Sequence, residues 1–138
     1  MNRVSHLRRR ILVVEDETAI AMIFEEVLWE AGFEVVGPVS KLAAAISLAR
    51  EEVLDAAVLD ITIRGGAVYP VADILIQRNV PFVLASGYEE WALPDAYRGL
   101  PRLSKPFTPE DIDRMLAQLF PPLRGTEEYG RNRPGPRI

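Results

Sequence analysis

The sequence has no cysteine and only one histidine, His6, among its 138 residues. A chain without cysteine forms no disulfide and offers no thiolate to a metal, which excludes disulfide-stapled domains and cysteine-based zinc sites. The absence of cysteine is compatible with a reducing compartment, and we expect a cytoplasmic protein. We expect His6 to be solvated, because it lies in a short basic stretch with no candidate partner.

Long apolar runs are also missing. A helix that crosses a bilayer needs about 20 consecutive apolar residues, and no run in this sequence approaches that length. The arginines at 8–10 resemble the charged start of a secretory signal, but the apolar run after them is broken at Glu15. The sequence therefore predicts neither a membrane span nor a secretory signal.

Positive charge is scarce in the body of the chain and gathers at its ends. Residues 1–10 carry +4 and residues 121–138 carry +2, so a total of −4 leaves −10 on residues 11–120. An acidic body repels nucleic-acid phosphates, and we expect no nucleic-acid partner. We expect a flexible basic arm at 1–10 and a disordered tail at 121–138. The alternative is that these basic ends contact RNA or an acidic partner.

The sequence does contain a regular alternation of short apolar runs and longer amphipathic stretches. The runs, which are typical of buried parallel strands, lie at 11–14, 34–39, 54–59, 81–85 and 100–104. Helical periodicity or helix-start signals predict helices at 18–31, 41–52, 70–78 and 109–119. The pattern predicts one α/β domain over residues 11–120, with a doubly wound, five-stranded parallel sheet of the flavodoxin-like order 2-1-3-4-5.

Residues that begin or interrupt helices refine this prediction. Ser40 is expected to cap the helix at 41–52, and Thr108 is expected to cap the last helix. Pro94 and Gly99 interrupt residues 89–99. We therefore expect at most a short or mobile helix there.

Polar side chains follow four of the five predicted strands at the point where each strand ends. Glu15 and Asp16 follow the first strand, Asp60 the third, Ser86 the fourth and Lys105 the fifth. These strands are neighbours in the predicted order, and their carboxyl ends form the edge where open parallel sheets bind ligands. Three acids, a hydroxyl and a lysine there make a site for a divalent cation and a phosphoryl group. The alternative is a set of unrelated loop residues, with Ser86 in an ordinary turn and the first acids favoured by a helix N-terminus.

Together these residues resemble the receiver domain of two-component response regulators over residues 11–120. The matching segments are Ile-Leu-Val-Val-Glu-Asp-Glu at 11–17, Leu-Asp at 59–60, Ala-Ser-Gly at 85–87 and Ser-Lys-Pro-Phe at 104–107. The resemblance implies that Asp60 accepts a phosphoryl group from a histidine kinase or a phosphotransfer protein. Because His6 is the single histidine, the donor histidine must belong to another protein or be replaced by a small phosphodonor.

The resemblance also implies a Mg²⁺ site. Mg²⁺ prefers octahedral oxygen ligands and keeps several waters, so few protein carboxylates bind it directly. Asp16 and Asp60 are the expected direct ligands, and Glu15 is expected to act through water. The family adds a backbone carbonyl two residues after the phosphoacceptor, which here belongs to Thr62. Glu17 is expected to be only an acid at a helix N-terminus.

Two further residues are implied to contact the phosphoryl group. Lys105 supplies a fixed positive charge to the acyl phosphate. In the family the Lys-Pro bond is cis and aims the lysine inward, and Lys105–Pro106 is expected to do the same. Ser86 is expected to donate a hydrogen bond to a phosphoryl oxygen.

The sequence departs from the common receiver pattern at three places. Many receivers carry a switch aromatic three residues before the lysine, where this chain has Arg102. Residues 81–88 instead resemble the FATGUY-type sub-family, which consists mainly of stand-alone alphaproteobacterial receivers with a mobile fourth helix. Tyr88 is therefore the candidate switch residue. The loop at 61–66 lacks the usual Leu/Met-Pro-Gly pattern, so its shape is open.

The leading hypothesis is a CheY-like single-domain response regulator that is not an enzyme and signals by phosphorylation-dependent protein binding. A phosphate sink or shuttle in a phosphorelay is an alternative that the sequence does not separate from it. An inactive receiver that acts as a scaffold is a further alternative. A phosphatase with an aspartyl nucleophile is disfavoured because such enzymes carry a second aspartate where this chain has Thr62. The kinase, the downstream target and the oligomeric state are not predicted.

Overall fold

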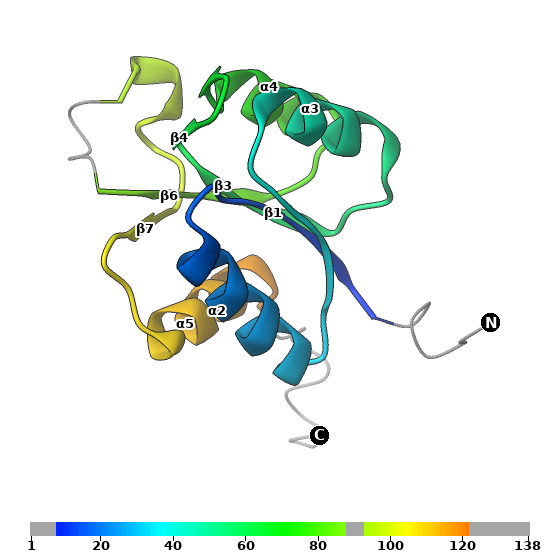
Figure 1. The fold of residues 1–138 in the computed structure, drawn as a ribbon, viewed down its shortest axis with the longest axis vertical. Coiled ribbons are helices and arrows are strands. Elements are labelled where there is room, and N and C mark those ends of the chain that lie inside the picture. The colour runs from blue at the N-terminus through cyan, green and yellow to red at the C-terminus, as the bar shows by residue number, and fades with distance from the viewer. Residues whose placement is uncertain (1–7, 88–92, 122–138) are drawn as a thin grey trace.

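The computed structural model describes residues 8–87 and 93–121. Its central sheet has five parallel strands in the order β2-β1-β3-β6-β7, which is the predicted topology (Figure 1). The strands are β1 (Arg10–Val14), β2 (Glu34–Val39), β3 (Ala56–Asp60), β6 (Phe82–Ser86) and β7 (Arg102–Ser104). The three central strands β1, β3 and β6 are almost wholly buried, which explains why they are nearly continuous apolar runs.

Four helices cover the two faces of the sheet, as Figure 1 shows. They are α2 (Thr18–Glu30), α3 (Leu42–Glu51), α4 (Tyr69–Gln77) and α5 (Pro109–Leu119). One core cluster packs α3 and α4 against one face, and a second packs α2 and α5 against the other. Within residues 8–87 and 93–121, no helix has the length and apolarity needed to cross a membrane.

The ends of the helices follow the sequence signals with one exception. Thr108 caps α5 through a capping box with Asp111, as predicted. Gly32 follows α2 with a φ of +96°, which favours glycine. The predicted cap at Ser40 is wrong, because Lys41 is the N-cap of α3 and no side chain caps it. The backbone carbonyl of Ser40 instead accepts a hydrogen bond from the amide of Arg64.

That Arg64 contact belongs to a small hairpin that the sequence analysis treated as a loop. Strands β4 (Thr62–Ile63) and β5 (Gly66–Ala67) pair in antiparallel fashion directly after Asp60. Gly65 and Gly66 turn the chain with φ values of +97° and +132°, which side chains rarely adopt. The hairpin gives a defined shape to the segment in which the sequence departs from the common receiver pattern.

The segment between β6 and β7 contains a single short 3₁₀ helix in its described part, at Asp95–Tyr97. This agrees with the prediction of at most a short helix at 89–99, although residues 88–92 lie outside the described residues. Tyr97 stacks on Tyr69 of α4, with ring centroids 4.5 Å apart, and its hydroxyl donates to Asp73 at 2.7 Å. These contacts fix the segment to α4.

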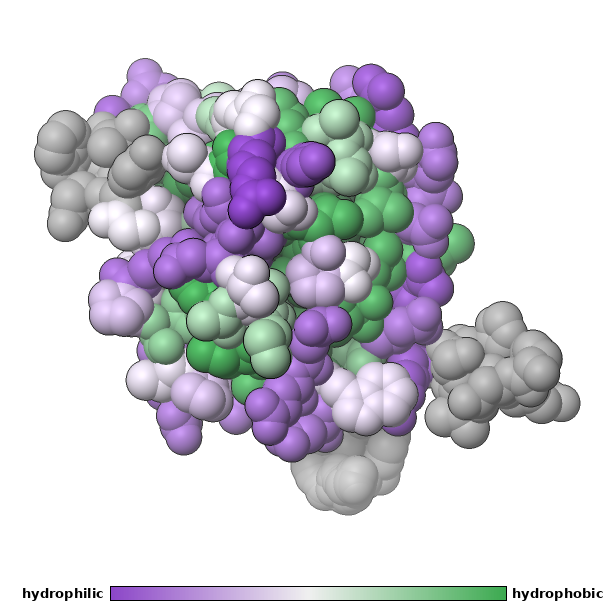
Figure 2. Space-filling model, in the orientation of Figure 1, coloured by the Kyte–Doolittle hydropathy of each residue, from purple (hydrophilic) through white to green (hydrophobic). Residues whose placement is uncertain are grey.

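The β2 edge of the sheet faces the reader in Figures 1 and 2. Among the described residues, strand β2 pairs only with β1. Figure 2 shows apolar residues reaching the surface between polar ones on this face. Met22 and Trp29 of α2 are both well exposed, at 60% and 59%. The guanidinium of Arg8 lies 4.1 Å from the centre of a Trp29 ring, which covers part of this apolar surface.

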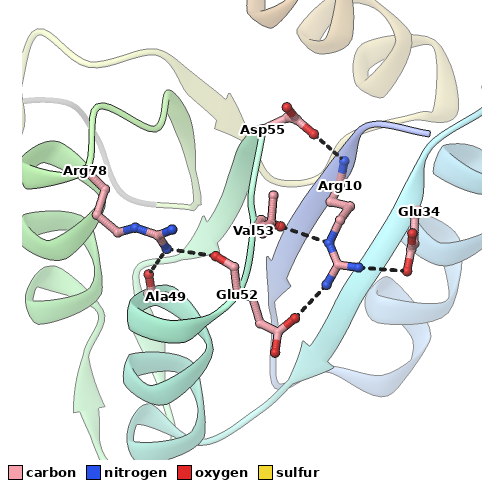
Figure 3. Close-up of polar contacts among 7 residues, drawn as sticks. All are labelled: Arg10, Glu34, Ala49, Glu52, Val53, Asp55 and Arg78. Atoms are coloured by element: carbon pink, nitrogen blue, oxygen red, sulfur yellow. Dashed lines mark hydrogen bonds and ion pairs between the residues drawn. The ribbon is translucent and has the colours of Figure 1, made fainter. Parts of the chain in front are cut away.

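At the amino-terminal ends of the strands, Arg10 of β1 contacts the start of β2 and the end of α3 (Figure 3). Its guanidinium pairs with Glu34 at 3.1 Å and with Glu52 at 2.6 Å, and its Nε donates to the Val53 carbonyl. Its backbone amide donates to Asp55. The expected flexible arm at 1–10 is wrong for Arg10, which is the first residue of β1. Because Arg10 follows two other arginines, the sequence gives no sign that it alone forms structural ion pairs with Glu34 and Glu52.

We expect Arg10→Met to lower the free energy of unfolding by about 1–2 kcal/mol, because it removes two ion pairs of a side chain that is only 28% exposed. Arg50→Met, on the exposed side of α3, is the matched control and should change stability by less than about 0.5 kcal/mol. Urea unfolding monitored by circular dichroism measures both. Equal midpoints for the two variants would contradict a structural role for Arg10.

Candidate functional site

The carboxyl ends of β1, β3 and β7 bring the predicted acids and the lysine together. Glu15 and Asp16 directly follow β1, and Asp60 is the last residue of β3. Each of these three residues offers a carboxylate oxygen, and these oxygens all lie within 4.8 Å of one another. Strands β1 and β3 are hydrogen-bonded neighbours in the sheet, which places the two strand ends side by side. The sequence prediction of an acidic cluster at this edge is confirmed.

Lys105 lies against the acidic cluster. Its Nζ is 3.2 Å from Asp60 Oδ2 and 3.3 Å from Glu15 Oε1. The Lys105–Pro106 peptide bond is cis, as the resemblance implied. The backbone amide of Lys105 donates to the Ser86 carbonyl at 2.9 Å, so the end of β6 holds the lysine at this edge. One fixed positive charge thus lies between two carboxylates.

Glu15 is the most buried acid of the cluster. The residue is 3% exposed, and its Oε2 accepts a hydrogen bond from the Glu17 amide at 3.0 Å. Its Oε1 is close to Lys105 Nζ but accepts no hydrogen bond among the described residues. A buried carboxylate oxygen without a hydrogen bond is costly. This oxygen is therefore available to a water or to a cation in the cluster.

Burial and mutual repulsion shift the titration of this site. Burial raises the pKa of Glu15 from 4.5 to about 7; the Glu17 amide opposes the rise and the nearby Asp60 adds to it. Burial likewise raises the pKa of Asp60 above its usual 3.8, although the charge of Lys105 opposes this. Burial alone would lower the pKa of Lys105, but attraction to Asp60 and Glu15 raises it overall. The site thus holds a proton readily when no cation is bound.

We expect the protein without divalent cations to lose stability as the pH rises from about 4.5 through 7. A folded-state pKa of about 7 for Glu15, against 4.5 when unfolded, means that the folded state holds the extra proton in this window. The resulting stabilisation is complete below pH 4.5, is lost as the pH rises through 7 and is on the order of 3 kcal/mol. Mg²⁺ must displace this proton, so its affinity should rise over the same range.

Urea unfolding in EDTA at pH 5 and pH 8 measures this effect, with Glu15→Gln as the comparison. The stability difference between wild type and Glu15→Gln isolates the Glu15 carboxyl from every other titrating group. We expect that difference to shift in favour of Glu15→Gln at pH 8. A difference that is the same at both pH values would show that Glu15 does not titrate in this window.

Ser86 and Thr62 lie near the cluster, but their predicted roles are not tested by its geometry. Ser86 is the last residue of β6 and is 4% exposed. It pairs in register with Ser104 of β7, directly before Lys105. Thr62 is two residues after Asp60 in β4 and is exposed. The hydrogen bond from Ser86 and the carbonyl ligand from Thr62 remain predictions, and Tyr88, the candidate switch residue, lies outside the described residues.

One contact of the site, between Glu17 and Lys105, is not predicted from the sequence. From the sequence, Glu17 is expected to be only an acid at a helix N-terminus, and it is indeed the N-cap residue of α2. Its carboxylate, however, also lies 3.8 Å from Lys105 Nζ, although its side chain is 66% exposed. The sequence did carry a signal for this contact, because Glu17 directly follows Glu15 and Asp16. A third acid at that position lies within reach of Lys105.

The donor set fits a hard divalent cation. Three carboxylates supply oxygen atoms, which are the ligands that Mg²⁺ prefers. Glu15 Oε1 accepts no hydrogen bond, and the pKa values of Glu15 and Asp60 are raised, which indicates that the cluster has more negative charge than Lys105 alone compensates. An added positive charge would relieve this repulsion. The residues present therefore fit Mg²⁺.

Comparison with known proteins agrees with the fold. No protein-family model matches the chain. The transcriptional regulatory protein PdtaR of Mycobacterium tuberculosis is 30% identical over 108 residues, which cover 75% of this chain. The chain spans about half the length of this relative, 53%.

Two solved structures are similar over nearly their whole length. SdrG from Sphingomonas melonis Fr1 is 39% identical with a TM-score of 0.71, and the match covers 81% of this chain and 96% of SdrG. A response regulator receiver protein from Sinorhizobium medicae WSM419 is 32% identical with a TM-score of 0.67, and the match covers 81% of this chain and 94% of that one. With the acidic cluster and its lysine in place, the chain belongs to the response-regulator receiver family.

Proposed function

We propose that this receiver domain accepts a phosphoryl group on Asp60 in a Mg²⁺-dependent reaction and passes the signal on by phosphorylation-dependent protein binding. One observation carries the proposal: the Glu15, Asp16 and Asp60 carboxylates lie within 4.8 Å of one another, with Lys105 Nζ 3.2 Å from Asp60. Such an arrangement suits phosphoryl transfer, which depends on positioning and on positive charge near the phosphoryl oxygens.

The proposed reaction needs only groups of this site and a phosphodonor. An Asp60 oxygen attacks the phosphorus atom and forms an acyl phosphate, while the bond from phosphorus to the donor nitrogen or oxygen breaks. With a phosphohistidine donor, the neutral imidazole leaves after taking up a proton. Lys105 stays next to Asp60 and offsets the charge of the phosphoryl oxygens, and Ser86 donates a hydrogen bond to one of them.

The metal would be held by the acidic cluster. Asp16 and Asp60 are the proposed direct ligands, with the Thr62 carbonyl, and Glu15 is proposed to act through water. When bound, Mg²⁺ supplies positive charge against the transferring phosphoryl group. Lys105 compensates only part of the negative charge of the acidic cluster. The remaining negative charge would attract the cation.

The proposed partners are a histidine kinase or phosphotransfer protein as donor and a protein target as receiver of the signal. SdrG has also been solved in a BeF₃-activated conformation. This chain is 38% identical to that structure, with a TM-score of 0.68. This supports an activated state for the present chain as well. We propose that the chain is not an enzyme, since the phosphoryl group ends on its own Asp60.

Intact-mass spectrometry after incubation with Mg²⁺ and acetyl phosphate tests the proposal. We expect one phosphoryl adduct per chain, and no adduct when EDTA replaces Mg²⁺. An adduct that forms equally well in EDTA would contradict a role for the acidic cluster in metal binding. If no adduct forms with acetyl phosphate, phosphoramidate or a phosphorylated histidine kinase, the phosphoacceptor proposal fails.

A further inference from the structure

Arg102 is a charged residue that neither the fold nor the proposed reaction uses. It is the first residue of β7 and is half-buried, opposite Leu84 in the neighbouring strand. Its Nη1 is covered and has no hydrogen-bond partner, and no ion pair engages its guanidinium within residues 8–87 and 93–121. A covered guanidinium nitrogen without a hydrogen-bond partner destabilises a fold. An anionic partner from outside the described residues would compensate this charge.

Arg102 lines a cavity of about 340 Å³ between β7 and α5. Figure 1 shows the chain passing from β7 through a loop into α5. The cavity combines two kinds of wall. Leu103, Pro106 and Met115 contribute apolar groups, whereas Arg102, Asp111 and Arg114 contribute charge. A ligand for this space therefore has both a charged head and an aliphatic stem.

Of the charged residues that line the cavity, Arg102 is the one whose charge no described residue compensates. Asp111 accepts a hydrogen bond from the Thr108 amide at 2.8 Å as part of the helix cap, and this bond lowers its pKa. Asp111 also pairs with Arg114 one turn along α5. The acid and the second arginine thus compensate each other, and the positive charge of Arg102 is left for an anionic ligand.

We propose that this cavity binds a glutamate side chain from an acidic segment of a partner protein. The carboxylate pairs with Arg102, and the two methylene groups of the glutamate pack on Leu103 and Met115. Inorganic phosphate has no aliphatic stem, and its second charge is disfavoured by Asp111 in the wall. The inference goes beyond the proposed function, because it requires neither Mg²⁺ nor a phosphoryl group on Asp60.

Nuclear magnetic resonance titration of the ¹⁵N-labelled full chain tests the proposal in EDTA and without a phosphodonor. The probe is the blocked peptide Ac-Leu-Glu-Glu-Leu-NH₂, and the matched probe carries glutamine in place of glutamate. We expect saturable shifts of the Arg102 Nε–H and of the Leu103 and Met115 amides with the glutamate peptide alone. The affinity should fall at least tenfold in Arg102→Met and stay at the wild-type value in Arg50→Met.

Several outcomes would overturn the proposal. They are equal binding of the glutamine peptide, unchanged binding by Arg102→Met, and binding of inorganic phosphate at this cavity as tight as that of the glutamate peptide. Because the titration excludes phosphorylation, each of these failures leaves the proposed reaction at Asp60 intact.

Thermal unfolding of the same variant tests the premise that Arg102 has no folding role. We expect Arg102→Met to melt at or above the wild-type temperature, because it replaces an unpartnered charge with an apolar side chain of similar length. A clearly lower melting temperature would assign Arg102 to the fold and overturn the premise. Arg102→Lys keeps the positive charge but lacks the planar guanidinium with its paired N–H donors. It should bind the glutamate peptide better than Arg102→Met does.

Discussion

Asp60→Asn is expected to abolish the phosphoryl adduct completely. The amide that replaces the carboxylate is not a nucleophile for phosphorus, and it also turns one of the three negatively charged carboxylates of the acidic cluster into a neutral group. Intact-mass spectrometry after incubation with Mg²⁺ and acetyl phosphate measures the adduct. Asp113→Asn makes the same change at an exposed position of α5 and should be phosphorylated like wild type.

The loss in Asp60→Asn should come from chemistry and not from unfolding. Asp60 carries a pKa raised by burial, so the neutral amide avoids part of the desolvation that the carboxylate suffers. Lys105 keeps Glu15 as a partner at 3.3 Å. We therefore expect Asp60→Asn to unfold in urea at or above the wild-type midpoint. A full adduct on Asp60→Asn would place the phosphoryl group on another residue and refute the assignment.

Lys105→Met is expected to separate metal binding from phosphoryl transfer. Lys105 Nζ lies within 3.3 Å of both Asp60 and Glu15 and competes with a cation for these carboxylates. Its removal should therefore tighten Mg²⁺ binding several-fold. Phosphorylation should nevertheless slow by about 10²-fold, because the charge that offsets the phosphoryl oxygens is lost. Isothermal titration with Mg²⁺ and the time course of the adduct measure the two effects.

The control for this variant is Lys41→Met, which removes the other lysine of the chain from an exposed position before α3. It should leave both measurements unchanged. If Lys105→Met instead weakens Mg²⁺ binding, the lysine supports the acidic cluster rather than competing for it. If its rate of phosphorylation equals that of wild type, Lys105 does not act on the phosphoryl group.

The sheet and the main cluster of the site followed from the sequence because they rest on strong, local signals. Buried parallel strands must be apolar on both sides, so β1, β3 and β6 are visible as continuous runs. Once the strand order is given, the ends of neighbouring strands must meet. The predicted strand order therefore already places Glu15, Asp60 and Lys105 at one end of the sheet, where the structure has them in contact.

The contacts that sequence reasoning missed depend on partners distant in the chain. Arg10 was assigned to an arm because its neighbours are arginines, yet its partners are 24 and 42 residues away. Ser40 carries a capping side chain, but its backbone is used by the β4–β5 hairpin and α3 begins one residue later than expected. Local propensity does not report such pairings, because they form only when the sheet assembles.

The most direct test of the central claim is to locate the phosphoryl group. The phosphorylated chain is treated with borohydride, which reduces an aspartyl phosphate to homoserine, and its peptides are sequenced by mass spectrometry. We expect that Asp60 alone is reduced and that the reduction requires prior incubation with Mg²⁺ and phosphodonor. Reduction at Glu15 or Asp16, or a borohydride-resistant phosphoryl group on Ser86 or Thr62, would contradict it.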